Sequence, residues 1–99
     1  MLFVILGRDT PASLERRGAQ RAAHSERIRA LVDAGRLVLA GPLPAIDAPD
    51  PGPAGYVGSL IVADFGSREE AEAWVRTDPY VSGGVWGAVE VRPFLQSAP

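Results

Sequence analysis

Four apolar segments of strand length, with two helical segments between them, constrain the fold of this chain more than any other feature. The strand-like segments are rich in β-branched and aromatic residues and cover Leu2–Leu6, Arg36–Leu43, Ser59–Phe65 and Val85–Phe94. A helix is expected at Ala19–Gly35 and a second one from Ser67. The order βαββαβ predicts a ferredoxin-like fold of the α+β class, in which a four-stranded antiparallel sheet carries both helices on one face.

Local signals predict the limits of the first helix. Thr10 and Pro11 supply a cap and a first-turn proline for an approach segment, and Gly18 is expected to separate this segment from the main helix. Gly35 suits the position just after a helix, where the backbone often has a positive φ. The main helix is therefore expected to stop at Gly35.

The second helix has equally clear limits. Ser67 and Glu70 have the spacing of a capping box, which satisfies free N–H groups at a helix start. Pro79 disfavours the helical conformation in the residue before it, so the helix is expected to end by Asp78. The segment Tyr80–Gly84 that follows is expected to be a loop.

A segment rich in proline and glycine, Gly41–Gly58, contains five prolines and four glycines. Gly41 and Pro42 are expected to stop the second strand, because proline has no N–H group for the sheet. Loops of this length are uncommon inside compact domains and often form lids or pocket walls. The alternative is an inert insertion.

Composition narrows the function classes. The chain has 99 residues and is 46% hydrophobic, which predicts a single globular domain over residues 1–99. Its net charge is −2 and its arginines are scattered, so nucleic acid is not an expected partner. The absence of cysteine excludes disulfides and thiol nucleophiles, and the absence of lysine excludes a protein Schiff base. The apolar run Leu2–Leu6 is too short for a signal peptide or a membrane span, so we expect a cytoplasmic protein with no membrane partner.

Both faces of the predicted sheet are apolar. Leu60 and Val62 point to one face, Ile61 and Ala63 point to the other, and Leu2–Leu6 is apolar throughout. Helices cover one face only, and leaving the other wet would forgo about 1.5–3 kcal/mol for each large side chain. We therefore expect a homodimer in which the open faces of two sheets meet.

The only histidine lies on the apolar side of the first helix. At 100° per residue, His24 is within about 40° of Ile28 and about 20° of Leu31, so its ring is expected to point inward. An inward imidazole is either a structural ring or a base with a pocket in front of it. Asp78 follows the second helix and leads into the strand that pairs with the first strand, which brings it towards His24. The alternative is that Asp78 only caps a helix or bonds its own backbone.

Other chemistry lacks its sequence signature. One histidine without cysteine gives no spacing typical of a metal site, so we expect no metal. Ser59 and Ser82 do not lie in the elbow sequence of a serine nucleophile. Gly83 and Gly84 lack the further glycines and the lysine of a phosphate-binding loop. We expect no cofactor.

Several segments together resemble the YciI-like, or YCII-related, protein family. The resemblance covers nearly the whole chain and rests on the N-terminal MLFVILGRD, Ser13–Arg17, Ala23–His24, Gly35–Leu37, Ala40–Pro42, Ala54–Ser59, Asp78–Tyr80 and Gly84–Val85. It implies a dimeric α+β barrel built from ferredoxin-like subunits. It also implies a pocket with a His–Asp pair, for which the matching residues are His24 and Asp78.

The resemblance extends to function. Enzymes similar to this family include a dehydrochlorinase that acts on a hydroxylated aromatic ring without a metal or an organic cofactor. In the present chain the expected substrate-binding residues are Gly41, Pro42, Ser59 and Tyr80, of which Tyr80 stands next to the Asp-Pro corner.

These observations lead to three hypotheses about the function of the chain. The first is a small cofactor-independent enzyme of the lyase or isomerase type, in which His24 removes a proton and Asp78 stabilises the resulting imidazolium. Its substrate would be a small metabolite, such as an aromatic or lactone-like compound. The second is a non-catalytic binding or accessory protein with the same pocket. The third keeps His24 and Asp78 as a buried structural pair.

Overall fold

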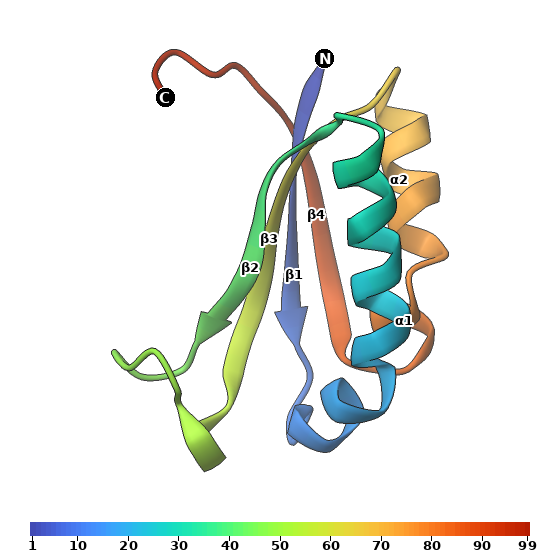
Figure 1. Cartoon of the computed structure of the whole chain (residues 1–99). Coiled ribbons are helices and arrows are strands. Elements are labelled where there is room, and N and C mark those ends of the chain that lie inside the picture. The colour runs from blue at the N-terminus through green and yellow to red at the C-terminus, as the bar shows by residue number, and fades with distance from the viewer.

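Four strands form one antiparallel sheet, and the helices lie on one side of it (Figure 1). The computed structural model describes residues 1–99, with β1 at Leu2–Asp9, α1 at Leu14–Asp33, β2 at Leu37–Pro44, the short 3-10 helix η1 at Gly52–Ala54, β3 at Tyr56–Asp64, α2 at Arg68–Arg76, α3 at Pro79–Ser82 and β4 at Trp86–Phe94. The strand order is β2-β3-β1-β4. The predicted α+β fold with βαββαβ order is confirmed, with α3 as an addition.

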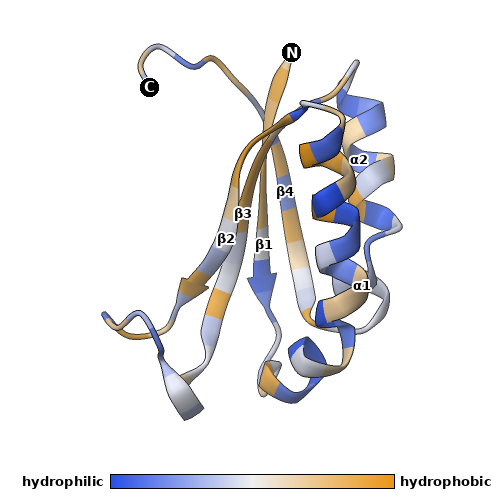
Figure 2. Cartoon of the chain, viewed as in Figure 1, coloured by the Kyte–Doolittle hydropathy of each residue, from blue (hydrophilic) through white to orange (hydrophobic).

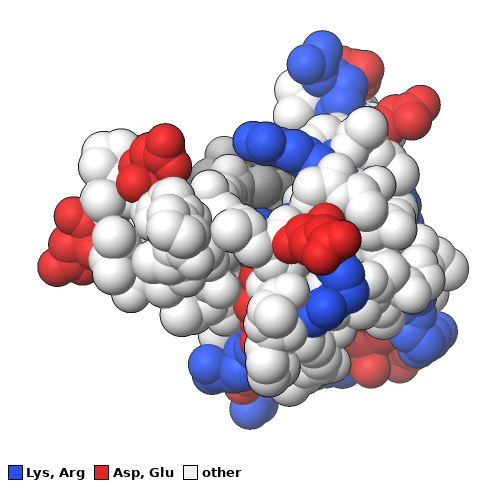
Figure 3. All heavy atoms as spheres, turned by 90° about the horizontal axis from the view of Figure 1, so that it is seen from below, with Lys and Arg blue, Asp and Glu red and all other residues white.

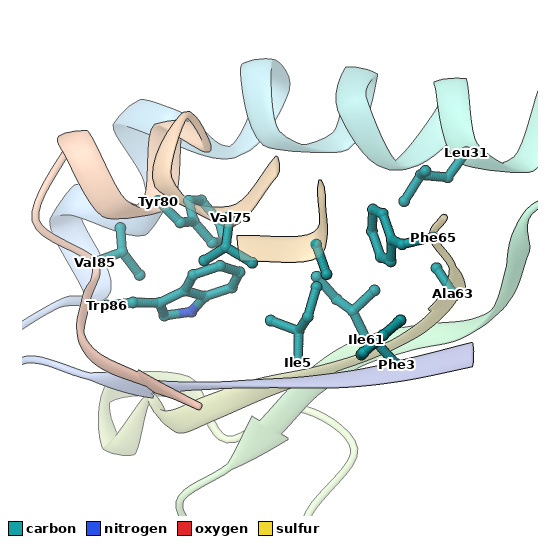
Figure 4. Close-up of a cluster of buried hydrophobic side chains, with 11 residues drawn as sticks. Phe3, Ile5, Leu31, Ile61, Ala63, Phe65, Val75, Tyr80, Val85 and Trp86 are labelled. Atoms are coloured by element: carbon teal, nitrogen blue, oxygen red, sulfur yellow. The ribbon is translucent and has the colours of Figure 1, made fainter. Parts of the chain in front are cut away.

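The register of the sheet separates its two faces. Ile5 pairs with Ile61 on the face under the helices, and both side chains are almost fully buried. Leu6 pairs with Leu60 on the opposite face, where no helix lies and both are only partly buried. The core is made by 11 residues of the covered face and the helices, namely Phe3, Ile5, Leu31, Ile61, Ala63, Phe65, Ala71, Val75, Tyr80, Val85 and Trp86 (Figure 4).

Gly7 allows a large ring to lie directly on β1. A Cβ atom at Gly7 would stand 2.5 Å from a ring atom of Trp86, so no larger residue fits without movement. Trp86 is 3% exposed and brings its indole to the end of the core nearest α3 (Figure 4). Gly7 therefore makes room for the Trp86 indole at this end of the core.

The approach segment and the break at Gly18 were wrongly predicted. Helix α1 begins at Leu14 and runs through Gly18 without interruption. The Thr10 hydroxyl donates to the Gly84 carbonyl at 2.6 Å, so it holds the β4 side of the molecule and caps no helix. One glycine costs a helix only about 0.5–1 kcal/mol, which the contacts of a helix of this length outweigh.

The predicted stop of the second strand at Gly41 and Pro42 was also wrong. Strand β2 continues to Pro44, and Pro42 pairs with Ser59 of β3. The reason is that β2 is an edge strand, where a proline can turn its missing N–H towards solvent. The loop between β2 and β3 is therefore shorter than expected and contains η1.

The connection after α2 contains a short helix that the sequence did not predict. The Ser67 hydroxyl accepts a hydrogen bond from the Glu70 N–H at 3.1 Å, as the capping box predicts, and α2 follows. Residues expected to be a loop after Asp78 instead form α3, a single helical turn. Proline at its first position and aspartate at its N-cap favour this turn, and Asp78 Oδ1 accepts from the Tyr80 N–H at 2.8 Å.

The hydropathy of the surface differs between the two sides of the sheet. In Figure 2 the strands are largely hydrophobic and the helices carry most of the hydrophilic positions. On the uncovered side, Leu39 at the β2 edge is 50% exposed and Phe94 at the end of β4 is 38% exposed. No helix has both the length and the apolar character needed to cross a bilayer.

Candidate functional site

A cavity of about 470 Å³ lies between α1 and the edge of the sheet formed by β2 and β3. Its lining is Leu14, Arg17, Gly18, Arg21, His24, Ser25, Ile28, Arg29, Val32, Ala40, Gly41, Pro42, Tyr56, Ser59, Ile61 and Tyr80. Figure 3 looks at the molecule from below Figure 1 and shows a hollow with basic side chains at its edge. The volume is in the range of small-ligand sites, about 300–1,000 Å³.

His24 projects from α1 into this cavity and is held on three sides. Its Nδ1 lies 2.9 and 3.1 Å from the two carboxylate oxygens of Asp78. Its ring stacks on Tyr80 with 4.0 Å between centroids, and the edge contact with Trp86 has a centroid distance of 5.4 Å. The side chain is only 13% exposed, so these contacts fix the plane of the ring.

The tautomer of His24 follows from its partner. A carboxylate only accepts hydrogen bonds, so Nδ1 carries the hydrogen that points at Asp78. Neutral His24 then has its lone pair on Nε2, which has no hydrogen-bond partner in the chain and is not sealed from solvent. This nitrogen is the group that can accept a proton from a molecule in the cavity.

Asp78 stands behind the imidazole and is fully buried. In addition to His24 it accepts from the Tyr80 N–H at 2.8 Å and from Arg27 Nη1 at 3.0 Å. Arg27 is itself held over the Trp74 ring, with 4.4 Å from Cζ to the centroid. Both interpretations of Asp78 are thus geometrically present, because one carboxylate caps α3 and also contacts His24.

A second buried carboxylate, Asp9 at the end of β1, holds Arg17 of α1. Arg17 donates from Nε and Nη2 to the two oxygens of Asp9 at 2.6 and 2.7 Å. The Ser13 hydroxyl donates to Asp9 at 2.6 Å, and the side chain of Asp9 is 2% exposed. This bidentate pair fixes the guanidinium at the wall of the cavity.

Two aromatic rings and a serine complete the surroundings of Arg17. Its Cζ lies 4.7 Å from the Tyr56 ring centroid and 5.3 Å from that of Tyr80. Its Nη2 also donates to the Ser59 hydroxyl at 2.9 Å and to the Gly58 carbonyl at 3.0 Å. Four acceptors and two rings leave little freedom to this side chain.

Tyr80 touches both charged clusters. Burial raises its pKa above the usual value of 10.0, the positive charges of Arg17 and Arg21 and the polar contact with the Arg17 side chain oppose that rise, and Asp78 adds to it. The net direction is upward, so Tyr80 stays neutral at physiological pH and retains a hydroxyl proton.

The comparison with known proteins places the chain in a family. The YCII-related domain matches residues 1–95. The chain belongs to the YCII-related family. The resemblance stated from the sequence is therefore confirmed. This YCII-related chain is 51% identical to Protein YciI of Escherichia coli O6:H1 over 94 residues, which cover 95% of this chain and 96% of that protein.

Two other relatives carry more specific descriptions. The YCII-related chain is 37% identical over 78 residues to the Xenovulene A biosynthesis cluster protein asL2 of Sarocladium schorii, with 75% of this chain and 68% of that protein covered. Its structure is similar to that of the 5-chloro-2-hydroxyhydroquinone dehydrochlorinase of Burkholderia phenoliruptrix AC1100, solved in complex with 2,5-dihydroxybenzoquinone. The TM-score is 0.84 at 28% identity, and the match covers 98% of this chain and 96% of that one.

The structure of the YCII-related chain brings the residues singled out from the sequence to one place. His24 and the four residues expected to bind substrate, Gly41, Pro42, Ser59 and Tyr80, all line the cavity. Asp78 does not line it but lies behind His24. No group of three or more His, Cys, Asp or Glu side chains is arranged to hold a metal ion.

Sequence reasoning missed the arginines of the cavity. Arg17 lies within a segment that matches the family, and neither Arg21 nor Arg29 is among the residues predicted for the site. The signal was present, because Arg17 precedes His24 by seven residues and Arg21 precedes Ile28 by the same spacing. Residues seven apart lie on one side of a helix, so the stripe of His24 also contains two arginines.

Proposed function

We propose that this chain is a small-molecule enzyme of the lyase or isomerase type, in which His24 is the general base. The observation that carries the proposal is the orientation of the imidazole, with Nδ1 on buried Asp78 and Nε2 free towards the cavity. The same arrangement of base and orienting carboxylate serves proton transfer in other enzymes.

The reaction step that fits this arrangement is a proton abstraction. Nε2 takes a proton from an activated carbon or an acidic hydroxyl of the ligand, and the electron pair of the broken bond moves into the conjugated system of the ligand. A lyase reaction then expels a leaving group, whereas an isomerase reaction returns the proton at another atom. Asp78 stabilises the imidazolium formed in between, and such assistance contributes about 10²–10⁴ in rate.

The relatives support the class of ligand. The structural neighbour is named a dehydrochlorinase and was solved with a dihydroxybenzoquinone, and a more distant relative is named a biosynthesis cluster protein. Loss of hydrogen chloride requires removal of a proton, which a single well-held base can supply. A hydroxylated aromatic, quinone-like or lactone-like metabolite is therefore the substrate class to test first.

A binding or accessory protein is the second candidate function. The structural role of Asp78 favours this second candidate, because Asp78 caps α3 and contacts Arg27. The two candidates separate in one screen of hydroxylated, halogenated and lactone compounds, with products followed by mass spectrometry and binding by thermal shift. An enzyme forms a product that His24→Ala does not form, whereas thermal shifts without any product support a binding protein.

We also propose that two copies associate through the uncovered face of the sheet. The partly buried Leu6 and Leu60 and the half-exposed Leu39 form an apolar surface there, and a second copy of the same face would cover it. Sedimentation should give about twice the 10.5 kDa chain mass. Leu60→Asp should dissociate the dimer, whereas Ala73→Asp on α2 should not. A monodisperse wild-type monomer would contradict this association.

A further inference from the structure

The cavity is lined by arginines without any carboxylate. Arg17, Arg21 and Arg29 reach its surface beside His24, and no aspartate or glutamate does. Arg21 and Arg29 are exposed and form no ion pair. The chain as a whole has a net charge of −2, so the basic lining is a local feature and opposes the overall charge. Such a lining raises the local concentration of anions.

Arg17 keeps one donor group free for the cavity. Its Nε and Nη2 are taken up by Asp9, Gly58 and Ser59, whereas Nη1 takes part in none of these hydrogen bonds. Nη1 is also not sealed from solvent, although the whole residue is only 7% exposed. Asp9 does not line the cavity, so a ligand meets the guanidinium and not the carboxylate behind it.

Ser59 supplies a second donor beside the first. Its oxygen accepts from Arg17 Nη2 at 2.9 Å, and its own proton has no acceptor in the chain. Because Ser59 lines the cavity, the hydroxyl can turn that proton to a ligand atom there. A charged donor and a neutral donor on the wall of one cavity can bind an oxyanion together.

The oxyanion site and the base lie against the same ring. The imidazole of His24 stacks on Tyr80 at 4.0 Å, and the guanidinium of Arg17 lies 5.3 Å from the same centroid. Both groups also line the cavity, so a ligand bound there lies near the two of them. Gly18, which lines the cavity next to Arg17 in the chain, has no side chain to fill this space.

We propose that the cavity selects a substrate that carries an oxyanion, namely a carboxylate or an ionised enol or phenol, and that Arg17 Nη1 and Ser59 Oγ bind this oxyanion beside His24. This inference goes further than the proposed function, and it rests on that function only in calling the ligand a substrate. Anion selection itself is measured by binding alone and does not depend on turnover.

The test compares two benzoquinones that share one ring and differ in charge. The probes are 2,5-dihydroxybenzoquinone, whose acidic enols are ionised at neutral pH, and 2,5-dimethoxybenzoquinone, which is neutral. Titration calorimetry at constant ionic strength should give tighter binding of the ionised probe to the wild type, by about tenfold or more, since hydrogen bonds to charged groups are among the strongest. Equal affinities for the two probes would overturn the proposal.

A double variant assigns the selection to Arg17. Arg17→Met combined with Asp9→Asn removes the buried pair as a unit and leaves the net charge of the chain unchanged, so any loss of anion binding is local. Affinity for the ionised probe should fall about ten- to hundredfold, and affinity for the neutral probe should stay. Ser59→Ala, which leaves the pair intact, should weaken only the ionised probe and covers the case in which the double variant fails to fold. Full anion preference in Ser59→Ala together with a folded double variant that keeps it would also overturn the assignment.

Two further variants separate this inference from the proposed function. Arg21→Gln should lower affinity for the ionised probe severalfold and flatten its salt dependence, whereas Arg76→Gln on α2, a matched exposed arginine away from the cavity, should not. His24→Ala should keep the anion preference. If His24→Ala keeps both the anion preference and full turnover, His24 is not the base, and the anion site is unaffected by that result.

Discussion

The two buried carboxylates of this molecule, Asp9 and Asp78, do similar work on different partners. Each side chain is at most 2% exposed, and each holds a residue of α1 against the cavity. Asp9 holds Arg17, whose charge is permanent, and Asp78 holds His24, whose charge depends on a proton. One side of one helix thus presents a fixed cation and a proton acceptor seven residues apart.

The two carboxylates also differ in how their charge is compensated. Arg17 is itself buried, so Asp9 and Arg17 depend on each other. Asp78 has a second cation, Arg27, whose side chain is 26% exposed and can reach water. Loss of Asp9 therefore strands a buried charge, whereas loss of Asp78 does not.

The largest expected effect concerns the division between chemistry and binding. His24→Ala should reduce turnover by about 10²–10⁴ once a substrate is found, because the base is removed. Binding of the ionised quinone probe should change little in this variant. Steady-state kinetics with calorimetry checks both statements, and a variant that loses binding and keeps turnover would reverse the roles assigned to the two residues.

Stability should separate the carboxylates next. Asp9→Ala should lower the free energy of unfolding by about 3–5 kcal/mol, because it leaves Arg17 buried without a counter-charge. Asp78→Ala should cost about 1–3 kcal/mol, because Arg27 can turn to solvent and His24 can stay neutral. Urea denaturation at pH 7 measures both, with Asp9→Ala/Arg17→Met as the control that should recover most of the loss. Equal costs would mean that the two pairs are not different in kind.

A smaller effect is expected from Tyr80, which lies between the two pairs. Burial raises its pKa in the folded state. The raised value means that its contribution to stability is fully present below about pH 10 and is lost as the pH rises through the folded-state pKa. Wild type should therefore lose more stability than Tyr80→Phe between pH 8 and pH 11 in urea titrations. Parallel losses in the two proteins would contradict the assignment.

The smallest effect should come from Gly18, beside Arg17. A Cβ atom there meets nothing within 4 Å, so Gly18→Ala should stabilise α1 by about 0.5–1 kcal/mol. The added methyl group lies at the cavity wall and should weaken binding of the quinone probe. Thermal unfolding and calorimetry on the same sample test both signs. Destabilisation would indicate that the helix is strained at this position.

The order of elements could be predicted because strands and helices leave different periodicities in the sequence. The limits could be predicted only where local chemistry decides them, as at Ser67. The strand stop predicted at Pro42 and the helix break predicted at Gly18 were wrong, because the effect of each residue depends on its place in the tertiary structure. Pro42 is tolerated since β2 is an edge strand, and Gly18 is tolerated since α1 is 20 residues long and one glycine costs it little.

Only part of the candidate site could be predicted from the sequence. Topology alone places Asp78 near the helix that follows the first strand, and the structure gives 2.9 Å between Asp78 and His24. Their chemical role stays a prediction. Asp9 is not among the residues predicted for the site, because a carboxylate at a strand end gives no sign of burial without its partner. Arg17 could have been found from its spacing to His24.

The contact between His24 and Asp78 has a consequence for the order of folding. These residues are 54 positions apart in the sequence, and Asp78 also caps the turn that leads into β4. Helix α1 can form from local contacts, but the loop closure that joins its histidine to this carboxylate must wait for β4 to dock beside β1. We expect low φ-values at His24 and higher ones within α1, so that an intermediate with an intact helix would still lack the finished site. Fluorescence of Trp86, which touches the imidazole, would report the moment of completion.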